Sequence, residues 1–253
     1  MHSYMLLHGL PGTGAQWEYV TEELGGYAVV APTFRGFSVD ETLADFPTTK
    51  EHAQQIVDWC DGETADLTIV AWSFSCHPLL YAMAEMGLRP ARAILIEPSA
   101  DVFLDECDRS RFGADAATAF GPLFQQISAA DNTSLARLSF EASGGLGAWE
   151  QLDDSQRRPF IQSAIALRRA FASGAAPDPI ALDKVSEISV PVEILLGAES
   201  REMFELAARR LCGLIGSAQL HIIPDADHLW PVTRPEALAA WLSRHNFRDC
   251  PAV

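Results

Sequence analysis

One stretch of the chain constrains its fold more than any other. Residues 67–72 read Leu-Thr-Ile-Val-Ala-Trp, a short apolar run with β-branched residues that predicts a buried strand. Ser73 follows at once, and residues 77–84 then show a helical pattern. A serine at such a junction is held on a strained turn with its hydroxyl clear of the sheet. The stretch therefore predicts a strand, a sharp turn and a helix, with Ser73 at the apex.

The positions on either side of Ser73 fit this turn only in part. Residues two before and two after the serine must be small, because strand and helix nearly touch there. Ala71 and Ser75 occupy these positions, where the usual G-x-S-x-G pattern has glycines. The motif is therefore degenerate, and a buried serine at a strand end is the plain alternative. The ends of the other strands decide between the two.

Size, charge and cysteine usage limit the class of protein. A chain of 253 residues suits one domain, with or without an insertion, and its net charge of −16 argues against nucleic acid or an anionic membrane as a partner. No apolar run approaches membrane-spanning length. Five scattered cysteines form no metal-ligand pattern and predict a reducing, cytoplasmic location. The sequence leaves the oligomeric state undecided, and a homodimer stays open.

Strands and helices alternate along most of the chain. This alternation predicts a mostly parallel, doubly wound sheet with helices on both faces. Helices are expected over about 16–24, 49–60, 201–214 and 235–244. The expected strands cover 3–7, 27–31, 67–72, 93–96, 191–197 and 219–223.

Residues 101–186 differ in character from the rest. Their pattern is helical and amphipathic, with breaks expected at Gly113, Asn132, Gly144-Gly145 and Gly174. A single crossover between parallel strands needs far fewer residues than this. The segment is therefore predicted to be an inserted helical cap, with residues 1–100 and 187–253 forming the core.

Residues with reactive side chains follow several of the expected strands. Ser73, Glu97 and His228 all lie just past a strand end, where parallel sheets bind their ligands. A serine hydroxyl becomes a nucleophile when a positioned imidazole takes its proton. His228 follows the last strand and comes after the serine, in the order Ser…Asp/Glu…His. This convergence favours a catalytic role for Ser73 and His228.

The acid that would orient His228 is not decided by chain order. The usual site lies three residues past the glycine that ends the penultimate strand, and here it holds Ser200. Glu97 and Glu199 are both available as replacements. Glu97 ends a buried strand and precedes a proline, which gives its carboxylate a rigid base. Glu199 lies in a loop beside Arg201, with which it is expected to form an exposed ion pair, so Glu97 is the favoured acid.

The loop after the first strand reads His8-Gly9-Leu10-Pro11-Gly12-Thr13-Gly14. Glycines allow a backbone N–H to approach a substrate closely. The N–H groups of the Gly9-Leu10 segment and of Phe74 are therefore predicted to form an oxyanion hole. His8 precedes the glycines without a nearby acid, so it is expected to orient the loop.

These motifs resemble the α/β-hydrolase superfamily over essentially the whole chain. Within it, the sequence is similar to the zearalenone hydrolases, which are lactonases of resorcylic acid macrolactones. The resemblance rests on the acid-lacking loop after Gly197-Ala198, on Glu97, and on residues 143–149, Ser-Gly-Gly-Leu-Gly-Ala-Trp. It implies Glu97 as the triad acid and a substrate contact for Trp149. The chain departs from that family at His8, which replaces an aspartate, and at residues 74–76, where the bulk of Phe74 is expected to narrow the pocket.

The resemblance implies a serine hydrolase without metal or cofactor that cleaves an apolar carboxylic ester, with a lactone, such as a zearalenone-like macrolactone, as the expected substrate. Trp72 and Trp149 are expected to line an aromatic-tolerant pocket, although large apolar residues more often pack between cap and core. Two alternatives stay open. One is carbon–carbon bond hydrolysis or cofactor-free dioxygenation on the same fold, and the other is a small-molecule receptor with little turnover.

Overall fold

The computed structural model describes residues 3–41, 43, 45–174 and 177–244. Its described strands form a six-stranded, all-parallel sheet in the order β2-β1-β3-β4-β5-β6. Helices follow most of the strands, as the alternation in the sequence predicted. The strands are β1 (Ser3–Leu7), β2 (Ala28–Val30), β3 (Leu67–Trp72), β4 (Arg92–Ile96), β5 (Val192–Gly197) and β6 (Ala218–Ile223).

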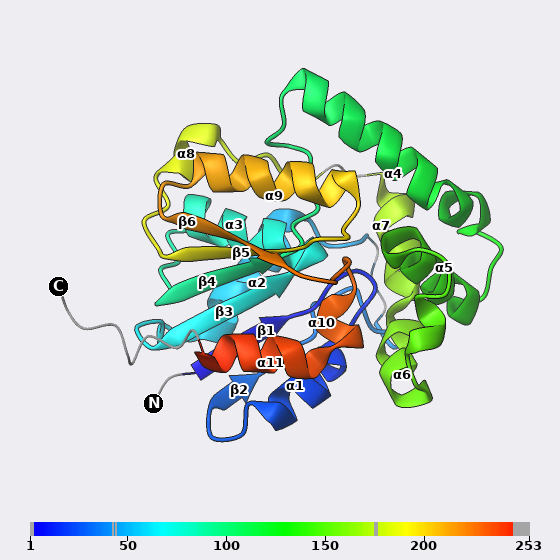
Figure 1. Cartoon of the computed structure of the whole chain (residues 1–253), viewed down its shortest axis with the longest axis horizontal. Helices are drawn as coiled ribbons and strands as arrows, with labels where there is room; N and C mark the ends of the chain where they lie inside the picture. Colours follow the sequence, from blue (N-terminus) through cyan, green and yellow to red (C-terminus); the bar gives the residue numbers. More distant parts are fainter. Residues whose placement is uncertain (1–2, 42, 44, 175–176, 245–253) are drawn as a thin grey trace.

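The central strands are apolar on both sides, which requires a layer of helices on each face. In β3, Ile69 and Ala71 face one hydrophobic core, while Val70 and Trp72 face the other. The first core lies under α2 (Thr49–Cys60), α3 (Cys76–Glu85), α8 (Leu182–Ser186) and α9 (Glu202–Leu214). The second lies under η1 (Gly14–Trp17), α1 (Glu18–Glu23), α10 (Trp230–Thr233) and α11 (Pro235–Arg244) (Figure 1). The sheet is therefore covered on both faces.

Four of the helices between β4 and β5 stand beside the carboxyl end of the sheet (Figure 1). Three of them begin at an aspartate whose side chain accepts a backbone N–H of the first turn, which stabilises the start of a helix. The helices are α4 (Glu106–Gln126), α5 (Asn132–Gly144), α6 (Asp154–Ser163) and α7 (Ile165–Ser173), with a short turn, η3 (Trp149–Gln151), between α5 and α6. In the described part of the chain, no helix is long and apolar enough to cross a membrane.

The structure differs from expectation in two places within this segment. The break predicted at Gly113 is wrong, because α4 runs through it: one exposed glycine costs a helix only about 1 kcal/mol. The ends predicted at Gly144-Gly145 and Gly174 are confirmed. In addition, α8 lies within the predicted cap range but packs against α3 and α9. The division into core and cap stays a prediction. The packing of α8 groups this helix with the predicted core rather than with the predicted cap.

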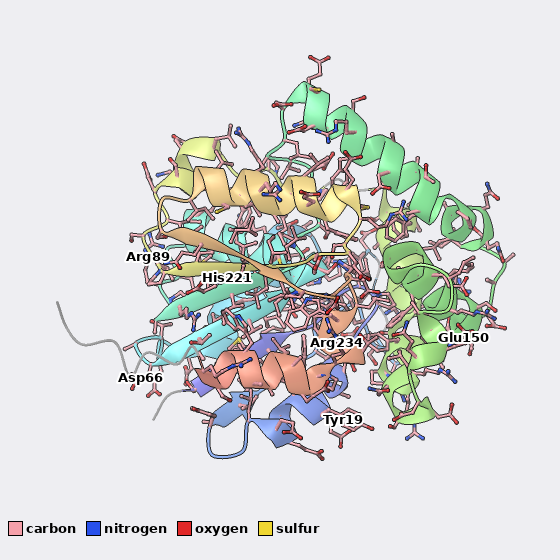
Figure 2. The ribbon with its side chains drawn as sticks, viewed as in Figure 1. Tyr19, Asp66, Arg89, Glu150, His221 and Arg234 are labelled. Atoms are coloured by element: carbon pink, nitrogen blue, oxygen red, sulfur yellow. The ribbon has the colours of Figure 1, made fainter. Side chains whose placement is uncertain are left out.

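A buried charged cluster lies at the amino ends of the strands. Glu193 pairs with Arg92 at 3.0 Å and also contacts the imidazole of His221. Figure 2 shows His221 within the sheet, with Asp66 and Arg89 on the surface at the same end. Ser73 follows the carboxyl end of β3, so this cluster is separated from it by the length of the sheet. Its contacts are those of a structural ion pair.

Candidate active site

The strand order creates a crevice beside Ser73. The chain passes from β1 to β2 on one side and then returns to β3 on the other, so the direction of winding reverses between β1 and β3. Ligands bind outside the carboxyl ends of the strands at such a point. The loop that carries Gly9 and Leu10 follows β1, and Ser73 follows β3. The topology therefore brings the predicted oxyanion loop next to the predicted nucleophile.

Ser73 occupies a strained turn between β3 and α3. Its φ of 56° lies in the left-handed region, which a side chain such as serine rarely adopts. Ser75 is fully buried two positions later, and its Oγ accepts the N–H of Trp72 at 2.9 Å. The same hydroxyl donates to the carbonyl oxygen of Leu7 at 3.1 Å. Ser75 therefore replaces the usual glycine and also ties the turn to the end of β1.

Phe74 lies beside the nucleophile in sequence, but its ring points away from the pocket. It packs edge-on against Phe34 and His52, with ring centroids 6.2 and 5.3 Å away, and also contacts Phe37 and Phe46. The expectation that its bulk narrows the pocket is wrong, because an aromatic cluster under the loop after β2 holds the ring. The backbone N–H of Phe74 stays the predicted oxyanion donor.

His228 is a buried residue held from three sides. Its ring stacks on Phe204, with centroids 3.7 Å apart and 15° between the planes. Trp72 donates its indole N–H to the backbone oxygen of His228 at 3.1 Å. Nδ1 lies 3.6 Å from Oε2 of Glu97. These contacts fix the imidazole at the carboxyl ends of β3 and β4.

Of the two candidate acids, the structure places Glu97 next to His228. Glu97 is fully buried just past β4, with a φ of 53°. Glu199 is exposed, and its backbone N–H donates to the oxygen of Ala226 at 2.8 Å. The expected pair between Arg201 and Glu199 is wrong: Arg201 instead pairs with Asp115 of α4. Glu97 is thus the carboxylate within reach of the imidazole.

The two oxygens of the Glu97 carboxylate have different surroundings. Oε1 accepts the backbone N–H of Gly197 at 2.6 Å and the hydroxyl of Ser200 at 2.8 Å. Oε2 lies 3.6 Å from Nδ1 of His228, and neither of these two buried atoms has a hydrogen-bond partner among the described residues. A side chain at Gly197 would meet the oxygen of Ala226 at 2.3 Å, so the glycine lets the two loops approach. One oxygen is anchored and the other faces the imidazole.

His8 anchors the loop after β1, as the sequence predicted. Its Nδ1 donates to the oxygen of Gly9 at 2.8 Å, and its Nε2 accepts the N–H of Phe34 at 3.0 Å. These two bonds require the neutral imidazole, because one nitrogen must donate and the other accept. Burial lowers the pKa of His8 to about 3. His8 therefore has the environment of a neutral structural residue.

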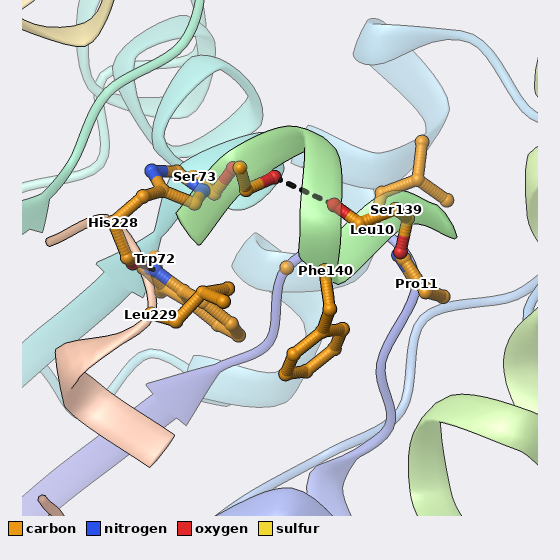
Figure 3. A pocket seen from close by; sticks show the side chains of 10 residues that line it. Leu10, Pro11, Trp72, Ser73, Ser139, Phe140, His228 and Leu229 are labelled. Carbon is orange, nitrogen blue, oxygen red and sulfur yellow. Dashed lines mark hydrogen bonds between the residues drawn. The ribbon is translucent and has the colours of Figure 1, made fainter. Parts of the chain in front are cut away.

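A pocket joins these residues (Figure 3). Ser73 and His228 lie on one side of it, and Leu10 and Pro11 on the other. The serines contributed by α5 donate their hydroxyl protons to carbonyls of their own helix. The remaining lining residues are Gly9, Trp72, Ser139, Phe140, Ser143 and Leu229. Trp72, predicted to bind substrate, is thus part of the wall.

The structure places Trp149 behind the pocket wall. Its ring is buried and meets Phe140 edge-on with centroids 5.2 Å apart, and Arg157 covers its other side. Phe140, which sequence reasoning missed, forms the wall instead. Nothing in the helical pattern of residues 132–144 distinguishes Phe140 from an ordinary core residue. Trp149 is not among the residues that line the pocket, and the substrate contact expected for it stays a prediction.

The described residues offer no second kind of reactive centre near Ser73. Among them, no group of three or more His, Cys, Asp or Glu side chains could hold a metal ion. Cys76 is buried three residues after Ser73, and its thiol faces the oxygen of Ala71 at 3.4 Å. Burial raises the pKa of Cys76, so its sulfur stays protonated and is a poor nucleophile.

A parallel sheet with a serine on a strained strand–helix turn, a histidine after the last strand and a buried acid defines the α/β-hydrolase class. The chain belongs to the Alpha/beta hydrolase family, whose pattern matches residues 5–241. A comparison with curated proteins finds no match. The finer resemblance to zearalenone hydrolases therefore stays a prediction.

Solved structures share this fold at low sequence identity. A thermophilic esterase from Thermogutta terrifontis has a TM-score of 0.74 and 19% identity, with 96% of this chain and 89% of that chain covered. The esterase RhEst1 from Rhodococcus sp. has a TM-score of 0.76 and 17% identity, with 98% and 90% covered. An enol-lactonase from Burkholderia xenovorans has a TM-score of 0.73 and 15% identity, with 96% and 91% covered. At these identities the likeness concerns the fold.

Proposed function

We propose that this protein is a serine hydrolase that cleaves small carboxylic esters, including lactones, through an acyl-enzyme intermediate. One observation carries the proposal: Ser73 and His228 line the same pocket, and the imidazole of His228 faces the buried carboxylate of Glu97. These three groups have the chemistry of a nucleophile, a general base and an orienting acid. The esterases and the lactonase among the structural neighbours are in keeping with this assignment.

In the first half of the reaction, Ser73 attacks the acyl carbon while Nε2 of His228 takes the hydroxyl proton. Glu97 faces Nδ1 and stabilises the imidazolium that forms. The negative charge on the acyl oxygen is held by N–H groups of the Gly9-Leu10 segment and of Phe74. Such donors are worth about 10²- to 10³-fold in rate each.

In the second half, His228 passes its proton to the leaving alkoxide and then activates a water that releases the acyl group. In a lactone the alkoxide stays attached to the acyl chain, so the product is one hydroxy acid. No cofactor enters this scheme, because proton transfer and charge stabilisation by the chain's own groups are sufficient for ester cleavage.

The walls of the pocket favour a small substrate. Phe140 closes one side of the pocket at Ser73, and its ring is held there against Trp149 and Phe160. Because Ser139 and Ser143 donate their protons within α5, that wall offers no free hydroxyl donor to the substrate. A short acyl ester or a small lactone fits this space better than the macrolactone expected from the resemblance.

The proposal is tested by turnover of p-nitrophenyl acetate, a five- or six-membered lactone and a resorcylic macrolactone. We expect turnover of the acetate and the small lactone, lowered about 10⁴-fold or more by Ser73→Ala. The matched control is Ser217→Ala, since Ser217 donates only to backbone carbonyls before β5. Equal turnover by wild type and folded Ser73→Ala contradicts the mechanism. Ring cleavage without ester hydrolysis favours carbon–carbon hydrolysis or dioxygenation, and ligand-induced stabilisation without turnover favours a receptor.

A further inference from the structure

The loop after β5 carries a hydroxyl where the sequence pattern expected an acid. Ser200 lies three residues past Gly197, and its Oγ donates to Oε1 of Glu97 at 2.8 Å. This position is part of the hydrogen-bonding shell of the acid, although it contributes no carboxylate of its own. Its role is not explained by the attack, proton transfer and deacylation steps above.

The carboxylate of Glu97 needs such a partner for two reasons. A glutamate side chain has one more rotatable bond than an aspartate, so its orientation is less determined by the backbone. It is also fully buried, so its oxygens depend on hydrogen-bond donors from the protein rather than from water. Arg201, which follows Ser200 in sequence, is paired with Asp115, and Arg92 of β4 is paired with Glu193. Hydrogen-bond donors are therefore the available means of holding the charge and its direction.

The donors around Glu97 act on one oxygen only. Gly197 and Ser200 both donate to Oε1, and the backbone N–H cannot rotate. With Oε1 fixed at two points, the plane of the carboxylate is set and Oε2 is directed to Nδ1 of His228. Loss of the Ser200 hydroxyl leaves a single anchor, about which the carboxylate can turn.

We propose that Ser200 is a positioning residue that acts through Glu97, orienting Oε2 of this acid toward His228. The inference rests on the proposed function, because its effect on rate passes through the imidazole. Partners that support a reactive group typically contribute about 10- to 100-fold to activity. The hydroxyl, rather than the volume of the side chain, is the group that matters.

Two isosteric variants separate the hydroxyl from the shape. Ser200→Thr keeps the hydroxyl group. Ser200→Val introduces a side chain of the same shape as threonine that has no hydroxyl group. We expect Ser200→Val to lower kcat on p-nitrophenyl acetate by about 10- to 100-fold with KM nearly unchanged, and Ser200→Thr to stay within about threefold of wild type. Ser200→Ala should behave like Ser200→Val, and the melting temperature of each variant is measured beside Ser217→Ala.

The outcomes distinguish this inference from the proposed function. If Ser73→Ala abolishes turnover but Ser200→Val and Ser200→Thr have equal kcat, the positioning role is wrong and the hydrolase mechanism stands. An equal loss in both variants, in proportion to a lowered melting temperature, also overturns it, because packing would then explain the effect. If Ser73→Ala has no effect, the proposed function fails first.

Discussion

The phenyl ring of Phe204 lies flat against the imidazole of His228, with centroids 3.7 Å apart and planes inclined by 15°. Phe204 belongs to α9 and is fully buried, so the ring is a rigid surface under the imidazole. The face of the histidine is thereby fixed independently of Glu97, which contacts only its edge through Nδ1.

Phe204→Leu should therefore impair catalysis more than stability. Leucine keeps the site apolar, but it is smaller than phenylalanine and offers no flat surface. We expect kcat to fall about tenfold, since small displacements of a reacting group are costly. Phe103→Leu is the control, because Phe103 meets His77 at 5.8 Å outside the pocket. An equal kcat in both variants would show that the stack has no catalytic role.

The two glutamates can be compared directly. Glu97→Gln preserves the shape of the side chain but replaces the charge that faces Nδ1, and should lower kcat by about 10³- to 10⁴-fold. Glu199→Gln changes an exposed side chain and should stay within about twofold of wild type. Steady-state kinetics on one ester measures both. A large loss in the second variant with little in the first would reverse the assignment.

The neutral state of His8 makes the fold sensitive to acid. Folded His8 has a pKa of about 3, whereas its ordinary value is 6.5, so on acidification the unfolded chain takes up this proton first. Stability should therefore fall as the pH drops from about 6.5 toward 3, by about 2 kcal/mol at pH 5 from this residue.

His8→Asn removes the titrating group but keeps an amide donor for the oxygen of Gly9. Urea unfolding of both proteins at pH 7 and pH 5 isolates the contribution of His8, because the other histidines are common to both. We expect the variant to be less stable at pH 7 and to lose about 2 kcal/mol less than wild type on acidification. The same pH dependence in both proteins would mean that His8 is not held neutral.

The acyl preference should depend on Phe140 rather than Trp149. Phe140→Val enlarges the pocket, and should raise the ratio of kcat/KM for p-nitrophenyl hexanoate over acetate by about tenfold. Trp149→Phe alters a ring behind the wall and should leave this ratio within twofold while lowering the melting temperature. If Trp149→Phe changes the ratio and Phe140→Val does not, the substrate contact originally expected for Trp149 is restored.

Local patterns were sufficient for most of the fold. The apolar runs at 67–72, 93–96 and 191–197 could be predicted as strands. Consecutive residues in each face two separate cores, so the sequence of a buried strand is apolar along most of its length. The short helix α10 was missed: four residues with a proline give no helical period. The helix end predicted at Gly113 was wrong for a different reason. A glycine in a helical pattern suggests a break, but at an exposed position it costs the helix little free energy.

The site was predicted where it depends on strand ends and missed where it depends on distant contacts. Ser73 and Glu97 follow their strands directly, and His228 follows β6 after the short loop 224–227, so parallel topology places all three at the same edge of the sheet. The partner of Arg201 is Asp115, from α4, and no local pattern identifies a pair so far apart in sequence. Phe140 lines the pocket and Trp149 lies behind it because η3 packs against α5, and this packing could likewise not be predicted from a local pattern.

The central claim is that Ser73 carries the acyl group. The most direct test is acid quenching during turnover of p-nitrophenyl acetate, followed by intact-mass and peptide mass spectrometry. In His228→Ala, both acylation and deacylation lack their base, so the rate of adduct formation and the turnover should fall together. We expect one acetyl group on the peptide containing Ser73 in wild type, and none in Ser73→Ala. Acetylation confined to another residue, or steady ester hydrolysis with no acyl-protein at any time, would contradict this account.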